Sequence, residues 1–516
     1  QHLDPEDIFL ITKQGFAYFE DVFGLEYPFE KYDQIAVVDF NWGAMENAGA
    51  VTFLERLLVF RSKVTERMYN ARANTILHEM AHMWFGNMVT MKWWDDLWLN
   101  ESFAEWSSYL AMVEATRFKN SWTGFNQERK NWAYRQDQLS STHPIVTDMA
   151  DIDTVAGNFD GISYAKGASV LQQLVVHVGR DNFIAGLQKY FTKHAFANTT
   201  LDDLLVELTA TSGKDLTSWV SIWLQSAGVN TLRPSLEIEN DIYKSVSVIQ
   251  EAPTMPVGST QLRPHRLAVG LYDLSGENIS LRKSVELDVA GDKTVVTELA
   301  GEKVADLLLI NDRDLSYAKI RFDQRSITTL KAHLGKISDS LTRALCWSAA
   351  WDMLRDAEIS ATDFIEIALT GLSGEDDIAT VTTIGSQLAT AVEIYSAPTK
   401  RDSARLRVGN AYEKMLQAAE AGSDLQLQFA RNFTSFASSA EHNDLIKELL
   451  DGKLAGLKVD ADLRWTFVIA LAERGLMDKE ELSAQLLKDN TLNGQLSFAS
   501  ALAARPTADA KAETWK

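Results

Sequence analysis

The apolar side chains of residues 5–23 recur every three or four positions, which is the spacing of one face of an α-helix. This period is followed by Ile8, Ile11, Phe16 and Phe19. Asp4-Pro5 before the segment and Gly24 after it are typical start and stop signals of a helix. We therefore expect a helix over residues 5–23. Similar patterns predict further helices over residues 101–112 and 168–178, and around residues 181–194, 200–211 and 216–226.

Short apolar runs at residues 35–40 and 51–58 predict strands in the same region. The period changes after Gly228, where short segments mostly alternate apolar with polar residues between Gly, Asn, Asp or Pro signals. This alternation predicts a small antiparallel β-sandwich over about residues 232–322. From Ser326 onward the apolar residues step by three and four again, in a sequence rich in Ala and Leu, which predicts stacked helix pairs.

The chain of 516 residues is too long for one hydrophobic core and suggests about three domains. The changes of period place them at residues 1–227, 228–323 and 324–516, which gives a multidomain α+β fold. The content of 46% apolar and 23% charged residues is that of a globular protein, not a disordered one.

The net charge of −21 argues against nucleic acid or an anionic membrane as a partner, because both require clustered Lys and Arg. Cys346 is the only cysteine, so no intrachain disulfide can form and the chain is compatible with a reducing cytoplasm. No apolar run approaches the roughly 18 to 20 residues that span a bilayer. We expect a cytoplasmic protein of unknown oligomeric state.

Two histidines at helical spacing are the strongest chemical signal in the chain. His78 and His82 lie one turn apart, so both imidazoles can reach one ion, while Glu79 remains free to hold a water. This H-E-x-x-H pattern also occurs by chance, and ordinary helix residues are the alternative. The surrounding sequence favours a zinc site.

A catalytic zinc site normally uses three protein ligands and leaves the fourth position to water or substrate. Glu101, eighteen residues beyond His82 and near the start of the helix expected over residues 101–112, is the most plausible third ligand. Asp95 and Asp96 are candidates to orient a ligand imidazole, although either could equally cap a turn.

Three motifs together resemble a known family. The segment Gly43-Ala44-Met45-Glu46-Asn47, the H-E-x-x-H pattern and Glu101 within Trp-Leu-Asn-Glu are similar to the gluzincin aminopeptidases, family M1, of the aminopeptidase N type, and more narrowly to their actinobacterial branch. The resemblance implies a thermolysin-like zinc peptidase domain, a β-sandwich and a HEAT-like helical domain. It also implies one Zn²⁺ per chain and peptide substrates with a free N-terminus.

The resemblance assigns roles to two further residues. Residues 43–47 would form the edge of the cleft and pair with an extended substrate by strand addition. Glu46 would then bind the substrate's α-ammonium group. The alternative interpretation is that Glu46 is an ordinary solvated charge on a loop. Tyr164, which precedes the helix over residues 168–178, would stabilise the oxyanion together with zinc. Without the resemblance, Tyr164 would be read as a packing residue.

The expected reaction is hydrolysis of the first peptide bond by a zinc-activated water, with Glu79 acting as general base and then as general acid. Two alternatives stay open. A thermolysin-type endopeptidase shares the zinc motif, and a catalytically silent chain could act only as a peptide-binding scaffold.

Because nothing near Gln1 corresponds to the family's N-terminal β domain, we expect that this domain is missing and that the helical end is cut short. The preferred N-terminal residue is not predictable.

Overall fold

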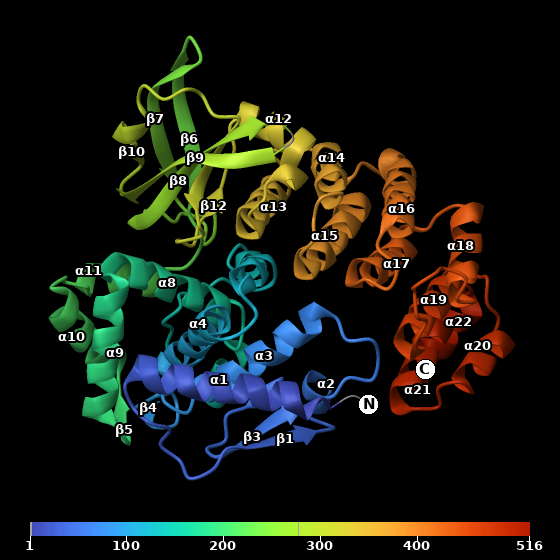
Figure 1. The fold of residues 1–516 in the computed structure, drawn as a ribbon, viewed down its shortest axis with the longest axis horizontal. Coiled ribbons are helices and arrows are strands. Elements are labelled where there is room, and N and C mark those ends of the chain that lie inside the picture. Colours follow the sequence, from blue (N-terminus) through green and yellow to red (C-terminus); the bar gives the residue numbers. More distant parts are fainter. Residues whose placement is uncertain (1–2, 277, 516) are drawn as a thin grey trace. The chain divides into compact units, whose positions relative to one another are not determined.

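In the computed structural model, which describes residues 3–276 and 278–515, a mainly helical region comes first, strands follow from Thr231, and helices return from Gln324 (Figure 1). This mixed α+β organisation is the one that the hydropathy pattern predicts. The described residues form two units. One contains residues 3–60 and 67–358, and the other contains residues 61–66 and 359–515. The candidate site lies entirely in the first unit.

The predicted helix over residues 5–23 is confirmed as α1 (Pro5–Phe23). Pro5 occupies the first turn, where its missing N–H costs nothing, and Gly24 closes the helix with a left-handed φ of 69°. Of the four residues that define the apolar face, Ile8, Ile11 and Phe19 are buried.

A small sheet follows, with the strand order β1-β3-β2. Its strands are β1 (Asp33–Val37), β2 (Ala44–Met45) and β3 (Ala50–Leu54). β1 pairs with β3 in parallel and β2 pairs with β3 antiparallel, so β2 lies at one edge of this sheet. The strand expected over residues 51–58 ends early, because Glu-Arg-Leu-Leu, a run of good helix formers, makes the short helix α2 (Glu55–Leu58).

Helix α4 (Leu97–Ala115) lies in the interior of the first unit. Nearly every residue from Leu97 to Met112 is buried, so α4 is covered all round rather than on one face. It contacts α1, α8 (Gly167–Val178) and the π-helical turn η3 (Ile162–Lys166). The helix predicted over residues 101–112 is thus the middle of a longer element. The helix predicted over residues 168–178 is confirmed as α8.

Further elements complete the region before residue 230. They are α3 (Glu66–Ala81), β4 (Val89–Met91), η1 (Trp94–Asp96), α5 (Ser121–Gly124), η2 (Phe125–Lys130), α6 (Asn131–Gln136), α7 (Ile152–Gly157), α9 (Arg180–His194), β5 (Ala197–Thr199), α10 (Leu201–Ser212) and α11 (Thr217–Leu224). Most of these elements contribute apolar side chains, with α1, α4 and α8, to one continuous hydrophobic core. Val155 of α7 lies instead in a separate small cluster with Leu97 and Met149.

The strand-rich region contains a four-stranded sheet of order β10-β7-β6-β12 and a three-stranded sheet of order β11-β8-β9. All pairings are antiparallel except β12 with β6. The strands are β6 (Thr231–Glu239), β7 (Ile242–Glu251), β8 (His265–Ser275), β9 (Asn278–Val289), β10 (Lys293–Val295), β11 (Leu307–Asp312) and β12 (Lys319–Ile320), with the 3-10 turn η4 (Thr297–Leu299). Helices α12 (Gln324–His333) and α13 (Ser340–Arg355), joined by η5 (Leu334–Lys336), complete the first unit.

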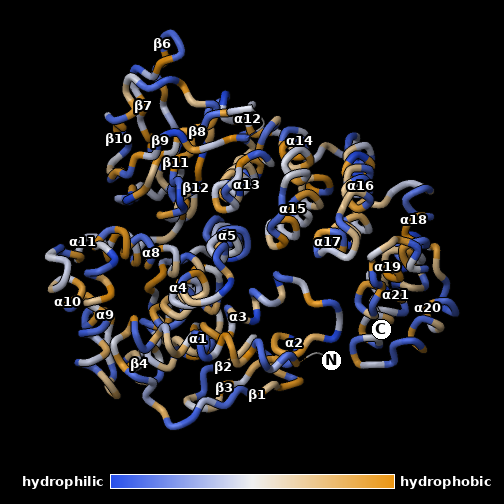
Figure 2. The backbone as a smooth tube through the Cα atoms, viewed as in Figure 1, coloured by the Kyte–Doolittle hydropathy of each residue, from blue (hydrophilic) through white to orange (hydrophobic). Residues whose placement is uncertain are grey.

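The second unit is helical. Its elements are α14 (Ala361–Leu372), α15 (Ile378–Thr390), η6 (Ala391–Tyr395), η7 (Pro398–Lys400), α16 (Arg401–Ala418), α17 (Asp424–Phe436), α18 (Ala440–Leu450), α19 (Ala461–Glu473), α20 (Lys479–Leu486), α21 (Leu492–Ala504) and α22 (Ala508–Trp515). Ser or Asp caps start several of them, such as Ser360 before α14 and Asp460 before α19. Figure 2 shows apolar and polar residues mixed along α14 to α17, as expected of helices with one buried face. Within the described residues, no helix is both long and apolar enough to cross a membrane.

Candidate functional site

Helix α3 presents the two histidines on one side of its last turn. His78 and Glu79 belong to this turn, and His82 follows directly after the helix ends at Ala81. The main-chain N–H of His82 still donates to the carbonyl of His78, so the helical spacing is kept. The two Nε2 atoms lie 3.1 Å apart.

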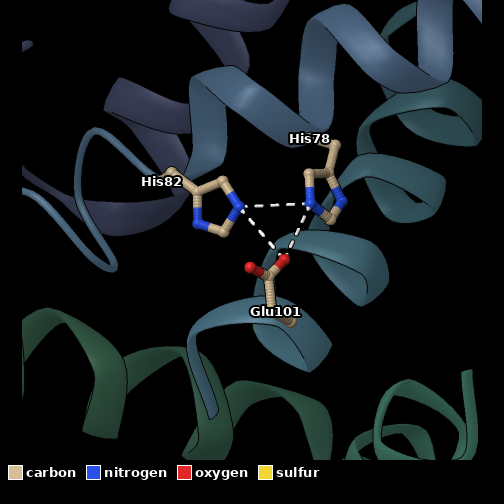
Figure 3. A group of neighbouring side chains, drawn as sticks. All are labelled: His78, His82 and Glu101. Atoms are coloured by element: carbon tan, nitrogen blue, oxygen red, sulfur yellow. Dashed lines mark hydrogen bonds and ion pairs between the residues drawn. The ribbon is translucent and has the colours of Figure 1, made fainter. Parts of the chain in front are cut away.

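Glu101 reaches the same point from α4. Its Oε2 atom lies 3.3 Å from His78 Nε2 and 3.5 Å from His82 Nε2. Figure 3 shows the two imidazoles and the carboxylate converging from two helices. All three side chains are buried. The structure therefore brings together the three residues that the sequence predicts as metal ligands.

The spacing of these atoms can be compared with that of a zinc site. Zn–N and Zn–O bonds of about 2.0–2.1 Å in a tetrahedron place ligand atoms roughly 3.3 Å from one another. The observed separations of 3.1, 3.3 and 3.5 Å bracket this value. The donor set of two imidazoles and one carboxylate is also that of known catalytic zinc sites. The residues present fit a zinc ion.

The two imidazoles are oriented by groups that the sequence analysis missed. His82 Nδ1 lies 2.7 Å from Asn100 Oδ1. His78 Nδ1 lies 3.6 Å from Glu105 Oε2, and Arg129 donates to both Glu105 oxygens, at 2.6 and 3.1 Å. Asn100 and Glu105 flank Glu101 on α4, at one position before it and four after it. This spacing from Glu101 is the sequence signal that could have identified both residues.

Asp95 and Asp96, which were the sequence-based candidates for this orienting role, bind elsewhere. Asp95 accepts a hydrogen bond from the main-chain N–H of Met149, and Asp96 accepts one from the main-chain N–H of Leu201. Both carboxylates therefore fasten loops, as the turn-capping alternative implies. They lie at the turn before α4, one to two helical turns before the position where a side chain of this helix faces the histidines.

Glu79 is buried beside the candidate metal ligands. Its Oε2 atom has no hydrogen-bond partner among the described residues, which leaves it free for a water or a substrate. Burial, reinforced by the carboxylates of Glu46 and Glu101 against the opposing effect of His82, raises the pKa of Glu79 well above its ordinary value. A carboxylate in this state accepts a proton readily.

The candidate ligands shift one another's pKa values through their charges. Burial opposes the protonation of His82, but the surrounding carboxylates, Glu46 first, outweigh it and raise the pKa of His82 to about 10. Burial also opposes the ionisation of Glu101, but its contacts with both histidines outweigh it and hold the pKa of Glu101 well below its ordinary value. The carboxylates of Glu46, Glu79 and Glu101 therefore line one cavity with the two imidazoles, an arrangement that favours a bound cation.

The segment over residues 43–47 forms one wall of the pocket through β2. Gly43, Ala44, Met45 and Glu46 line the cavity, whereas Asn47 does not. Asn47 instead closes the turn to β3, where its carbonyl accepts from the N–H of Ala50 and its amide donates to Thr52. One carboxylate oxygen of Glu46 lies within 4.8 Å of a carboxylate oxygen of Glu79 and of a ring nitrogen of His82. Four of the five residues predicted in this segment thus face the site.

Tyr164 lies on the π-helical turn η3, a local form that often marks functional sites. Its ring stacks near that of His78, with centroids 6.1 Å apart. Burial first, and then the nearby Glu101 carboxylate, raise the pKa of Tyr164 above its ordinary value, so its hydroxyl stays protonated and able to donate. The structure places Tyr164 in the same cavity as the candidate metal ligands.

The cavity has a volume of about 440 Å³. Besides the predicted residues, its lining includes Trp42, Arg129, Trp132 and Phe159. Trp42 and Phe159 are in contact, with ring centroids 5.1 Å apart, and the Arg129 guanidinium lies over the Trp132 ring at 4.7 Å. No periodicity or motif in the sequence singles out these four residues. Trp42 and Phe159 lie outside helices and strands, and Arg129 and Trp132 lie on the neighbouring elements η2 and α6.

Two sequence families match the chain. Residues 9–223 match the Peptidase family M1 domain, and residues 307–516 match the ERAP1-like C-terminal domain. The first match contains every residue of the candidate site described above. The second begins in β11 and covers the helical second unit.

Named relatives agree with these matches. Aminopeptidase N of Streptomyces lividans is 50% identical over 100% of this chain and 61% of its own length. Tricorn protease-interacting factor F2 of Thermoplasma volcanium is 30% identical over 90% of this chain and 56% of its own length. Aminopeptidase 2, mitochondrial, of Saccharomyces cerevisiae is 32% identical over 64% of this chain and 35% of its own length. The chain therefore spans less than two thirds of the length of each of these relatives.

Proposed function

Because the chain belongs to peptidase family M1, we propose that it is a zinc-dependent aminopeptidase, which hydrolyses the N-terminal amino acid from peptides. The family is zinc-dependent in general, and two of the relatives above carry the name aminopeptidase. These names favour the aminopeptidase over a thermolysin-type endopeptidase or a silent peptide-binding scaffold.

The proposed metal ligands are His78, His82 and Glu101, holding one Zn²⁺ per chain. The ligand-atom spacing near 3.3 Å supports this assignment. When bound, zinc supplies Lewis-acid activation of a water and of the scissile carbonyl. Glu105 orients His78, and Arg129 holds Glu105 in place, since ligand imidazoles depend on such partners.

Glu79 is the proposed general base and acid. Its unpartnered Oε2 atom can take the proton of the attacking water and return it to the leaving nitrogen. The Tyr164 hydroxyl is the proposed donor to the oxyanion of the tetrahedral intermediate, where a protonated group aimed at developing negative charge is required. The two residues face the cavity from different elements, α3 and η3.

The observation that carries the exopeptidase assignment is the position of Glu46. In a peptide, the α-nitrogen and the carbonyl carbon of one residue lie about 2.5 Å apart. A carboxylate that binds the α-ammonium must therefore lie close to the catalytic group, and Glu46 and Glu79 offer oxygens within 4.8 Å of each other. We assign Gly43, Ala44 and Met45 to the edge that pairs with the substrate backbone, and Asn47 to the turn behind it.

Several further assignments belong to the same proposal. The catalytic, thermolysin-like domain covers residues 1–227, a β-sandwich covers residues 228–323, and a HEAT-like helical domain covers residues 324–516. Supporting observations are the family match over residues 9–223 and the two mainly antiparallel sheets between Thr231 and Ile320. We propose peptides with a free N-terminus as substrates and the cytoplasm as the location.

The proposal is tested by product analysis. The purified chain, incubated with a mixed-sequence pentapeptide, should release amino acids one at a time from the N-terminus, as followed by mass spectrometry. A zinc chelator should abolish this release, and added Zn²⁺ should restore it. Internal fragments as first products would favour the endopeptidase. An absence of cleavage by the zinc-loaded chain would favour the scaffold.

A further inference from the structure

Asn100 contacts two parts of the candidate site at once. It lies directly before Glu101 on α4 and is buried. Its Oδ1 atom lies 2.7 Å from His82 Nδ1, and its Nδ2 atom donates to Glu46 Oε1 at 3.3 Å. One amide side chain therefore bridges a candidate metal ligand and the carboxylate assigned to the substrate ammonium.

Hydrogen-bond chemistry fixes which end of the amide faces which residue. A carboxylate oxygen accepts hydrogen bonds, so the NH₂ group of Asn100 faces Glu46. Oδ1 then faces His82 and accepts from its Nδ1–H. This choice leaves the Nε2 lone pair of His82 directed to the metal position, where Nε2 lies 3.1 Å from His78 Nε2. Both contacts of Asn100 are thus satisfied by one orientation.

The turn after His82 makes a second hydrogen bond to Glu46. Asn87 Nδ2 donates to the main-chain carbonyl of Glu46 at 2.7 Å. Gly86, beside it, has a φ of 129°, and a Cβ added there would lie 2.4 Å from Asn100 Oδ1. A side chain at residue 86 would therefore displace Asn100. Because this turn lies close to α4, Asn87 can contact the main chain of Glu46 while Asn100 contacts the Glu46 carboxylate.

We propose that Asn100, together with Asn87, is a positioning residue that fixes the Glu46 carboxylate relative to the metal ligand His82. The proposal rests on the proposed function. It explains how the carboxylate that binds the substrate ammonium is kept at a fixed distance from the metal ligands beside the scissile bond. Glu46 directly follows the short edge strand β2, and only Ala44 and Met45 of this segment pair with β3. The pairing of β2 therefore does not itself fix the Glu46 carboxylate. Loss of either asparagine should weaken the recognition of a free α-amine more than the binding of the rest of the peptide.

A binding experiment separates this role from general structural support. All variants are made in a Glu79→Gln background, which stops turnover, and are studied with excess Zn²⁺. Calorimetry gives the Kd of trialanine and of N-acetyl-trialanine, and the ratio of the two Kd values measures recognition of the ammonium group. The matched control is Asn70→Ala on α3, whose amide donates to Ser121 instead of Glu46. Elemental analysis gives the zinc content of each variant.

The parent and Asn70→Ala should prefer the free peptide by about tenfold or more, as expected for a charge-assisted contact. Asn100→Ala and Asn87→Ala should bring the ratio close to one while binding of the acetylated peptide changes little. Asn100→Ala should also hold zinc less tightly, by about 10- to 100-fold, because His82 Nδ1 loses its shorter contact and keeps only the Phe85 carbonyl at 3.2 Å, whereas Asn87→Ala should hold zinc normally. If Asn100→Ala does not fold, Asn87→Ala carries the test.

Two results would overturn the proposal, and they are distinguishable. If the parent discriminates and both asparagine variants discriminate equally well, the asparagines do not position Glu46, and the proposed function stands. If the parent binds both peptides with the same Kd, Glu46 does not recognise the ammonium group. The assignment of Glu46 in the proposed function then fails together with this inference.

Discussion

Ser102 Oγ donates a hydrogen bond of 2.5 Å to the main-chain carbonyl of Ser163. Ser102 directly follows Glu101, and Ser163 directly precedes Tyr164. The bond therefore ties the proposed metal ligand on α4 to the proposed oxyanion donor on η3. The contact is possible because the residue at the start of α8 is Gly167, where an added Cβ would lie 1.8 Å from Ser102 Oγ.

We predict that Gly167→Ala separates α4 from η3 and impairs both stability and catalysis. The added methyl group cannot be accommodated without moving Ser102 or α8, and overpacking of this kind costs typically about 1–3 kcal/mol. Urea unfolding measures the loss of stability, and kcat on a leucyl reporter should fall because Tyr164 moves away from Glu101. Gly124→Ala on α5 is the control, since nothing lies within 4 Å of the added Cβ. A normal kcat in Gly167→Ala would contradict the link between the two residues.

Tyr164→Phe should lower kcat by roughly 100-fold or more with little change in KM. The reason is that a donor to the oxyanion acts mainly in the transition state and contributes little to ground-state binding. Steady-state kinetics on the zinc-loaded protein decides the point. An increase in KM alone would indicate that Tyr164 is a packing or binding residue.

Metal content and activity should respond differently to changes at His78 and Glu79. His78→Ala or His82→Ala should lose zinc, because each removes one of three ligands. Glu79→Gln should keep zinc and lose activity, because the glutamate acts on the water. Elemental analysis and a reporter assay on the same preparations compare the two. A zinc-free Glu79→Gln protein, or one with near-normal turnover, would show that the roles are wrongly assigned.

The Arg129–Glu105 pair should matter for metal retention although neither residue is a proposed ligand. Arg129 donates two hydrogen bonds to Glu105, whose carboxylate lies beside His78 Nδ1. We expect Glu105→Ala to weaken zinc affinity by about 10- to 100-fold, and Arg129→Met to weaken it by less, because Glu105 would remain. Competition with a chelator of known affinity measures both. Equal zinc affinity in Glu105→Ala and the unchanged protein would contradict the orienting role.

Local signals in the sequence predict those parts of the fold that depend on neighbouring residues. Asp4-Pro5 and Gly24 give the ends of α1, and the spacing of His78 and His82 gives one side of the candidate site. These succeed because capping and helical periodicity operate within one or two turns of the chain.

Features that depend on tertiary packing could not be predicted in the same way. The expected strand over residues 51–58 ends at Leu54, where local helix propensity takes over. Arg129 on η2 contacts Glu105, 24 residues before it, and Asn87 in the turn after His82 contacts Glu46, 41 residues before it. No motif in the sequence marks either contact. Asn100 and Glu105 are predictable in principle, because a helix that contains Glu101 must carry them close to it. Asp95 and Asp96 lie on η1, before α4 begins, and no sequence signal marks that boundary.

The most direct test of the role of Glu46 is the ratio of kcat/KM for a leucyl reporter with a free amine to that for the same reporter N-acetylated. The zinc-loaded protein should hydrolyse the free-amine reporter at least about 100-fold more efficiently, and Glu46→Ala should remove most of this preference. Efficient hydrolysis of the acetylated reporter, or an unchanged preference in Glu46→Ala, would contradict the claim that Glu46 restricts this zinc site to free N-termini.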